Sequence, residues 1–321
     1  MVRAAHVAAI LPFWVRLALV CSWAVTSLAR TAAGPAPRML LLDGTRAGAE
    51  SIVVVGERGT ISLSKDEGET WTAATSGTPE TLTGVSFADS RTGWVVGHGG
   101  VVLVTHDGGS SWARSLTDEP VETSFLDVAV LDARTVIAVG AFGTLRTSHD
   151  GGATWTRPAV PENEPHLNRI LVDPKGIVVV VGEAGTVLVS TDRGITWSPR
   201  LNIASQVSFY GGLALPDGGL IVHGLRGHVF RQSRAGAPWE PVPLSHPVML
   251  ATSCRLDSGE LLFAGAARWV FVSHDQGKSL QRLELPLATA VAELIPLSHR
   301  QVLVLGEAGV TRISLPERVT P

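Results

Sequence analysis

The sequence predicts an all-β fold, a seven-bladed β-propeller of four-stranded antiparallel blades, and two repeating features predict it. Short apolar stretches that end in glycine recur along the chain, and an eight-residue motif, clearest at Ser148–Trp155, follows most of them. A repeat of about 42 residues rich in short apolar stretches has the length of one propeller blade. The marker glycines occur 41 to 43 residues apart, at Gly56, Gly97, Gly140, Gly182, Gly224, Gly265 and Gly306.

Each unit divides into four short strands, as its second copy illustrates. Residues 82–87 are expected to form the first strand, 93–97 the second and 101–105 the third, and the fourth begins at Trp112. Valine, leucine and aromatic residues dominate these stretches and are frequent in strands. Gly and Asp between the stretches favour tight turns. A linear solenoid is the alternative architecture, but polar terminal caps are not evident in the sequence.

The eight-residue motif reads as a hairpin turn. Asp150 can accept hydrogen bonds from nearby backbone N–H groups, and Gly152 can adopt the positive φ that such turns require. A catalytic residue has no reason to recur once per blade, so we expect the motif to be structural. The residues in question are Asp66, Trp71, Asp107, Trp112, Asp150, Trp155, Asp192, Trp197 and Asp275.

The two ends of the chain predict how the ring closes. The first copy begins at Met39–Leu42, while the last stops near Leu315, after its third strand. We expect residues 30–38 to supply the missing strand at the outer edge of the last blade. Pro35 and Pro37 are compatible with an edge strand, which does not need to donate every N–H. The propeller itself is expected to span residues 39–321.

Residues 1–29 resemble a secretory signal. Their only charged residues are Arg3 and Arg16, residues 17–28 are largely apolar, and Ser27–Ala29 offers small residues for cleavage. We therefore expect an exported protein of the periplasm or cell envelope, peripheral to the membrane and monomeric, with an uncleaved anchor as the alternative. The formal net charge of −3 argues against nucleic acid as a partner. No phosphate-binding, nucleophile-elbow or zinc-protease motif is present, and no cofactor is expected.

The pattern Ser-x-Asp-x-Gly-x-Thr-Trp is the Asp-box, or BNR repeat, which occurs in sialidases, sortilin-type receptors, some glucanases and the photosystem II stability/assembly factor family. The chain resembles the last of these best, over roughly residues 39–315, in units such as Gly93–Gly97 and Gly108–Trp112. This resemblance implies a non-enzymatic, exported scaffold that binds a membrane protein or an assembly intermediate. Asp-boxes predict the propeller more strongly than any function, and the family name does not establish photosynthesis here.

Partner binding is expected on the face opposite the Asp-boxes, which carries the turns between second and third strands and the connections between blades. The resemblance also implies an arginine-rich face, for which Arg58, Arg226 and Arg268 are candidates. The full set of candidate partner-binding residues is Arg58, His98, Phe142, Glu162, Glu164, His166, Asn168, Glu183, Arg226, His228 and Arg268.

Three other readings of the sequence remain open. The connection 157–168 carries carboxylates and a histidine that could suggest a metal, but no second set of ligands with metal spacing is visible, and a solvated loop is the simpler interpretation. Tyr210, the only tyrosine, raises the question of a sialidase, although the Arg-Ile-Pro motif of that class is absent. A glycoside hydrolase on the same fold is the competing function, and it would need a central pair of carboxylates.

Overall fold

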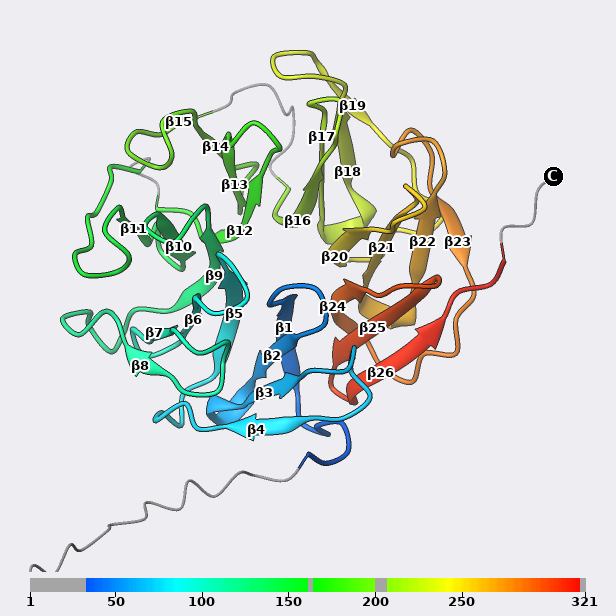
Figure 1. Cartoon of the computed structure of the whole chain (residues 1–321). Coiled ribbons are helices and arrows are strands. Elements are labelled where there is room, and N and C mark those ends of the chain that lie inside the picture. Colours follow the sequence, from blue (N-terminus) through cyan, green and yellow to red (C-terminus); the bar gives the residue numbers. More distant parts are fainter. Residues whose placement is uncertain (1–32, 161–163, 200–206, 318–321) are drawn as a thin grey trace, which may run out of the picture. The chain divides into compact units, whose positions relative to one another are not determined.

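The structure is a computed structural model that describes residues 33–160, 164–199 and 207–317. These residues form seven antiparallel sheets that stand around a common axis (Figure 1). Within each sheet the strands follow chain order from the axis outward, and each innermost strand contacts the innermost strands of the neighbouring blades. The contact between β1 and β24 closes the ring, so the predicted seven-bladed propeller is confirmed.

The blades share one sequence of strands. The innermost strands are β1 (Leu41–Arg46), β5 (Leu82–Phe87), β9 (Phe125–Val130), β12 (Leu167–Val172), β16 (Phe209–Ala214), β20 (Leu250–Arg255) and β24 (Val291–Pro296). The second strands are β2 (Ile52–Gly56), β6 (Gly93–Gly97), β10 (Val136–Gly140), β13 (Val178–Gly182), β17 (Leu220–Gly224), β21 (Leu261–Gly265) and β25 (Gln301–Gly306). The third strands are β3 (Ile61–Ser64), β7 (Val102–Thr105), β11 (Leu145–Ser148), β14 (Val187–Ser190), β18 (Val229–Gln232), β22 (Val270–Ser273) and β26 (Gly309–Ser314).

Outer strands complete five of the seven described sheets. They are β4 (Thr72–Ala74), β8 (Ala113–Arg114), β15 (Ser198–Pro199), β19 (Trp239–Pro241) and β23 (Gln281–Leu283). In the third blade a single bridge between Thr147 and Thr156 stands in place of an outer strand. Three of the turns between second and third strands are short 3-10 segments, η1 (Glu57–Gly59), η2 (Leu225–Gly227) and η3 (Ala266–Arg268).

The marker glycines are explained by a close approach of backbone. Each lies at the end of a second strand, where the inner strand bulges, and a Cβ atom there would lie 2.0 to 2.4 Å from a carbonyl oxygen of the chain entering the inner strand. Real Cβ atoms do not approach so closely, because the overlap would force the two strands apart. The repeating glycine therefore marks the point in each blade where the chain entering the inner strand lies against the end of the second strand.

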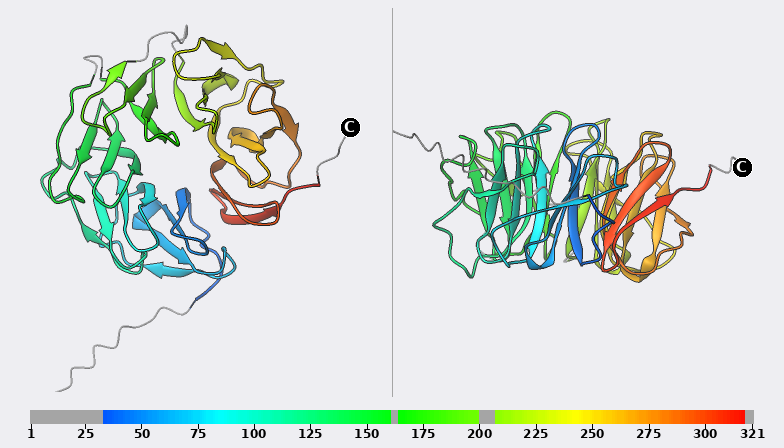
Figure 2. Two further views of the ribbon diagram at one scale, coloured as in Figure 1. Left: turned by 45° about the horizontal axis from the view of Figure 1, so that its top comes forward. Right: turned by 60° about the horizontal axis from the view of Figure 1, so that its bottom comes forward.

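The apolar core is divided among the seams between neighbouring blades. Figure 2 shows the blades side by side around the ring. The five residues of each second strand from β2 to β21 are all buried, and their side chains alternate between the two neighbouring seams. Val53 and Val55 pack toward the second blade, whereas Ile52 and Val54 pack toward the last one. This two-sided burial gives the near-continuous apolar stretches from which the repeat was recognised.

The N-terminal segment does not add a strand to the last blade within the described residues, so this expectation is corrected. Gly34 exchanges two backbone hydrogen bonds with Trp71 of the first blade, 2.8 and 3.0 Å long, and only Pro37 accepts a bond from β26, at Val310. Because Pro35 and Pro37 lack an N–H, the segment cannot donate to β26 there. The sheet β24-β25-β26 thus has three strands, and β1 begins at Leu41 rather than Met39. Residues 1–32, including the expected signal, lie outside the described residues.

Candidate functional site

The Asp-box side chains are occupied by their own turns. The Asp150 carboxylate accepts hydrogen bonds from the Thr154 backbone N–H at 2.9 Å, the Thr154 hydroxyl at 2.6 Å and the Ser148 hydroxyl at 2.8 Å. The bonds from Thr154 lower the pKa of Asp150 to about 2. Asp66, Asp107, Asp192 and Asp275 accept the same kinds of bond. The Asp-box carboxylates therefore stabilise their own turns, as expected for a structural motif.

Each Asp-box tryptophan fills the seam with the preceding blade. Trp155 donates its indole N–H to Gly152 at 3.1 Å and packs with Trp94, Val104 and Ala88 of the second blade. Trp112 packs in the same way against the first blade. The boxes therefore hold blades together, and the chemistry of partner recognition has to be sought elsewhere.

The opposite ends of the blades form what we call the turn face, made of the turns 57–59, 98–100, 141–143, 183–185, 225–227 and 266–268 and the connections between blades. Arg58 and Arg226 occupy the same position in their turns, with φ of 54° and 55°, and both are exposed. Arg268, with φ of 62°, stands one position later, where η1 and η2 have glycine. With the other described residues, none of the three forms an ion pair.

Three of the expected side chains meet on the third and fourth blades. Phe142, which is 71% exposed and has φ of 52°, contacts the His166 ring edge-on with centroids 4.8 Å apart. His166 in turn lies 3.8 Å from Glu183, measured from Nδ1 to Oε1. An aromatic ring, an imidazole and a carboxylate thus form one cluster on the turn face, in which Phe142 is exposed and His166 and Glu183 are half-buried.

The remaining expected residues are dispersed. Asn168 donates a 2.7 Å hydrogen bond to the Phe209 carbonyl at the start of the next inner strand, and His98 is 3.0 Å from the Ser124 hydroxyl. His228 stacks on Phe230, whereas Glu164 is exposed on its connection. Glu162 lies outside the described residues. Tyr210 occupies the bulge at the start of β16, as do Asn168 in β12 and Thr83 in β5.

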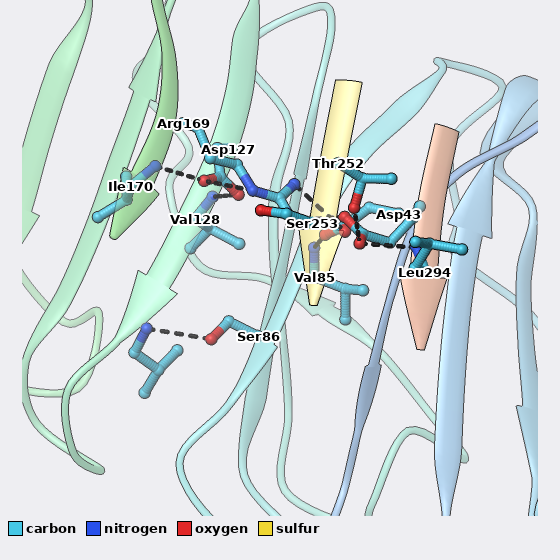
Figure 3. A network of polar contacts seen from close by, with 12 residues as sticks. Asp43, Val85, Ser86, Asp127, Val128, Arg169, Ile170, Thr252, Ser253 and Leu294 are labelled. Carbon is cyan, nitrogen blue, oxygen red and sulfur yellow. Dashed lines mark hydrogen bonds and ion pairs between the residues drawn. The ribbon is translucent and has the colours of Figure 1, made fainter. Parts of the chain in front are cut away.

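A charged network at the centre of the ring was missed by the sequence reasoning (Figure 3). The third residue of each inner strand follows a bulge, and these seven positions are Asp43, Gly84, Asp127, Arg169, Gly211, Thr252 and Glu293. Arg169 on β12 reaches Asp43 on β1 at 3.5 Å, Asp127 on β9 at 3.8 Å, and Glu293 on β24. Because β1 and β24 are not in neighbouring blades of β12, the Arg169 side chain crosses the centre of the ring.

The three carboxylates of this network are buried and fully engaged. Asp43 accepts the Val85 N–H at 2.7 Å, and Asp127 accepts those of Val128 and Ile170 at 2.9 and 2.7 Å. Glu293 accepts the Leu294 N–H at 2.8 Å and the Thr252 hydroxyl. The bonds from Val85, Ile170 and Thr252 connect three pairs of inner strands: β5 with β1, β12 with β9, and β20 with β24.

Burial dominates the acid-base behaviour of the network. Burial raises the pKa of Asp43 well above its ordinary value and raises that of Asp127, although Arg169 opposes both shifts. Burial also opposes charge on Arg169, but Glu293, Asp127 and Asp43 together raise its pKa. His223, fully buried beside Gly211, has its pKa lowered to about 4 by burial. Its Nδ1 donates to the Leu250 carbonyl at 3.2 Å, so Nε2 accepts from the Ser253 hydroxyl at 2.8 Å.

One signal in the sequence could have found these residues. Each of the seven positions precedes the marker glycine of its blade by the same number of residues, so Asp43 is to Gly56 as Arg169 is to Gly182. Charged side chains at a fixed phase of a buried inner strand point to a common axis. No group of three or more described His, Cys, Asp or Glu residues has a geometry that could hold a metal ion. No described helix is long and apolar enough to cross a membrane.

Comparison with known protein families agrees with this architecture. Residues 75–165 match the family model described as "Photosynthesis system II assembly factor YCF48", and residues 188–199 match the BNR/Asp-box repeat. The resemblance to the photosystem II assembly factor family is confirmed. A search of curated proteins finds no match.

Solved structures share the fold at low sequence identity. A structure titled "YCF48 bound to D1 peptide" is 21% identical, with a TM-score of 0.72, over 89% of this chain and 97% of that one. YCF48 from Cyanidioschyzon merolae is 19% identical, with a TM-score of 0.69, over 89% and 99%. An ancestral GH74 enzyme is 13% identical, with a TM-score of 0.71, over 89% of this chain and 46% of that one. At these identities the likeness establishes the fold alone.

Proposed function

We propose that this protein is a non-enzymatic scaffold that binds a membrane protein, or an intermediate in the assembly of a membrane-associated complex, through its turn face. The family match over residues 75–165 and the D1 peptide named with a structurally similar YCF48 support this proposal. A membrane protein segment that leaves the bilayer would be the natural ligand of such a face. The family match and the D1 peptide support the kind of partner. The geometry of this chain supports the turn face as the place where the partner binds.

The observation that carries the location is the presentation of arginine at strained turn tips. Arg58, Arg226 and Arg268 have a left-handed backbone, which costs non-glycine residues free energy and is more frequent at functional sites. All three are exposed and make no ion pair with the other described residues. Free guanidinium groups at such tips are suited to bind carboxylates on a partner.

The network on the axis supports a scaffold over the competing glycoside hydrolase. Such an enzyme needs one carboxyl group that can donate a proton to the leaving group and another that attacks or activates water. In this chain both oxygens of Asp43, Asp127 and Glu293 are engaged by Arg169, by backbone N–H groups or by Thr252. These three carboxylates therefore hold the inner strands together, and their oxygens are already occupied by these bonds. Turnover of a glycoside by the purified protein would reverse this conclusion.

A capture experiment with matched variants tests the proposal. The tagged chain and a variant with Arg58, Arg226 and Arg268 all changed to Ala are incubated with detergent-solubilised membranes of the host. We expect one membrane protein to be enriched by the parent chain and recovered about tenfold less by the variant, because arginine contacts dominate many interfaces. The matched control changes Arg114, Arg134 and Arg234, which are exposed away from the turn face. Equal recovery by both triple variants would contradict a turn-face site.

We further propose that the protein is exported and acts in the periplasm or cell envelope as a monomer. The support is the signal-like composition of residues 1–29. Fractionation of host cells and N-terminal sequencing test this part separately, and an envelope protein that starts at Arg30 is the expected result. Recovery of the intact chain in the cytoplasm would contradict export without bearing on the binding site.

A further inference from the structure

The seams between blades contain a repeated socket for an indole ring. Trp112 packs against Ala47, Val53 and Leu63 of the preceding blade. The equivalent residues of the second blade, Ala88, Trp94 and Val104, receive Trp155. The tryptophans at 71, 197 and 239 also pack into clusters with the preceding blade. We call the three positions that receive the ring the indole socket.

The sixth blade has this socket, but no Asp-box follows to fill it. Its three socket residues are Leu256, Leu262 and Val272, which belong to one apolar cluster with Leu315. After β26 the chain continues as Leu315–Glu317, so no box tryptophan is present there among the described residues. A pocket of about 200 Å³ remains, lined by the socket residues together with Glu260, His274, Arg300 and Leu315. Gln281, Arg282 and Glu317 also line this pocket, so its walls are both polar and apolar. Its volume exceeds the roughly 150 Å³ of a cavity that accommodates a benzene ring, so it has room for an aromatic side chain with polar groups at its rim.

An open strand edge lies across the seam from this socket, on β26 of the seventh blade. The Leu315 N–H bonds inward to the Arg300 carbonyl, whereas the Val310 N–H points outward to Pro37. Because backbone groups alternate along an antiparallel strand, Arg312 and Ser314 also present theirs outward. Within the described residues nothing pairs with these backbone groups. The chain's own N-terminal segment turns away from this edge, since Gly34 pairs with Trp71.

The socket and the edge have the spacing of one continuous segment. In the first blade Trp71 directly precedes β4, whose Thr72 pairs with Leu63 on β3. A segment that placed an aromatic ring in the sixth-blade socket would therefore reach the outward edge of β26 with its next residues. An exposed edge of this kind is a template for strand addition by another chain.

We propose that an extended segment of the partner protein docks here, pairing with β26 at Arg312 and Ser314 and inserting an aromatic side chain between the sixth and seventh blades. The proposal rests on the binding function proposed above and adds a second contact site with its own recognition chemistry. The partner segment completes the seventh blade as an Asp-box and outer strand complete the first. Aromatic anchors in preformed pockets are typical centres of binding energy.

The chain's own outer strand provides the probe. A fluorescein-labelled peptide with the sequence of Asp66–Thr75 carries Trp71 ahead of the strand residues, and a companion peptide has Trp71→Ala. We expect the full-length protein to bind the first peptide at least about tenfold more tightly than the second in an anisotropy titration, since the ring is the anchor. Equal affinity for the two peptides, or no binding of the first at about 1 mM, would overturn the proposal.

Two variants locate the binding. Leu315→Trp should fill the socket from inside, and Arg312→Pro should remove an outward N–H, a change that an edge strand tolerates. Each is expected to weaken peptide binding at least about tenfold, while Arg134→Ala leaves it unchanged. Urea unfolding of each variant establishes that it is folded. If both variants are folded and bind the peptide as tightly as the parent does, the peptide binds elsewhere and the proposed site is refuted.

Client capture separates this proposal from the proposed function. If the parent chain binds the peptide but recovers no membrane protein, the scaffold function fails and the docking site stands. If the parent recovers a client that Leu315→Trp and Arg312→Pro recover equally well, the scaffold function stands and the docking proposal fails.

Discussion

At the scale of single residues, His223 is a buried side chain that the ring keeps neutral beside the charged network on its axis. Gly211 on the neighbouring strand has no side chain, and a Cβ there would lie 2.4 Å from the His223 ring. The imidazole thus fills space that the glycine leaves at the axis. Its two nitrogens bond to β20 of the next blade, so the neutral ring connects two blades. A proton added to His223 would face the nearby Arg169, which further lowers the pKa of the histidine.

The depressed pKa of His223 predicts loss of stability in acid. A group whose pKa is lower in the folded state stabilises the fold above its unfolded pKa, and this contribution is lost as pH falls toward the folded value. Between the ordinary 6.5 and about 4, the loss amounts to about 3 kcal/mol. Urea unfolding of the parent and His223→Gln at pH 7 and pH 4 measures it. The difference between the two proteins should change by about 3 kcal/mol across this range, and parallel pH profiles would rule the histidine out as the cause.

At the scale of elements, much of the blade could be predicted because its signals are local. The strands at residues 82–87 and 93–97 are found where their apolar stretches indicate. The carboxylate of Asp43 could not be placed in the same way, because its partners Arg169 and Val85 come from two other blades. The pairing of the N-terminal segment could not be predicted either. Pro37 lies beside β26 and accepts one hydrogen bond from it, but Gly34 of the same segment pairs with the backbone of Trp71 in the first blade.

The marker glycine of each blade predicts a steric penalty that can be measured. A methyl group on Gly182 would lie 2.2 Å from the His166 carbonyl oxygen. We expect Gly182→Ala to lower the free energy of unfolding by about 1–3 kcal/mol, because β13 and the chain entering β12 must separate. Gly34→Ala is the matched control, since no atom lies within 4 Å of its Cβ position. Urea denaturation measures both, and a loss of less than about 0.5 kcal/mol at Gly182 would show that the crossing adapts without cost.

At the scale of the whole molecule, one arginine joins parts of the chain that neither neighbour it in sequence nor share a seam with its blade. Arg169 belongs to the fourth blade, whereas Asp43 and Glu293 belong to the first and the last. The seam between those two blades is where the ends of the propeller meet, and it lacks the covalent continuity of the other six. The cross-channel ion pairs therefore support the closure of the ring, together with Trp71 and the β1–β24 contact.

Replacing Arg169 by Met should destabilise the ring in a pH-dependent way. Removing one member of a buried ionic group leaves the others uncompensated, which typically costs about 3–5 kcal/mol. The pKa values of Asp43 and Asp127 are already raised by burial and should rise further without the arginine. A carboxyl group with a raised folded pKa stabilises the fold at low pH and loses that contribution as pH rises through the folded value. The deficit of Arg169→Met should thus be larger at pH 8 than at pH 5.

Hydrogen exchange distinguishes a ring-wide effect from a local one. In Arg169→Met we expect faster exchange in β1 and β24 as well as in β9, because all three strands lose a partner across the channel. Arg134→Met, an exposed change in a peripheral turn, is the control and should match the parent within about 0.5 kcal/mol. Faster exchange confined to β12 would mean that Arg169 stabilises only its own blade, and closure would then depend on the apolar seam around Trp71.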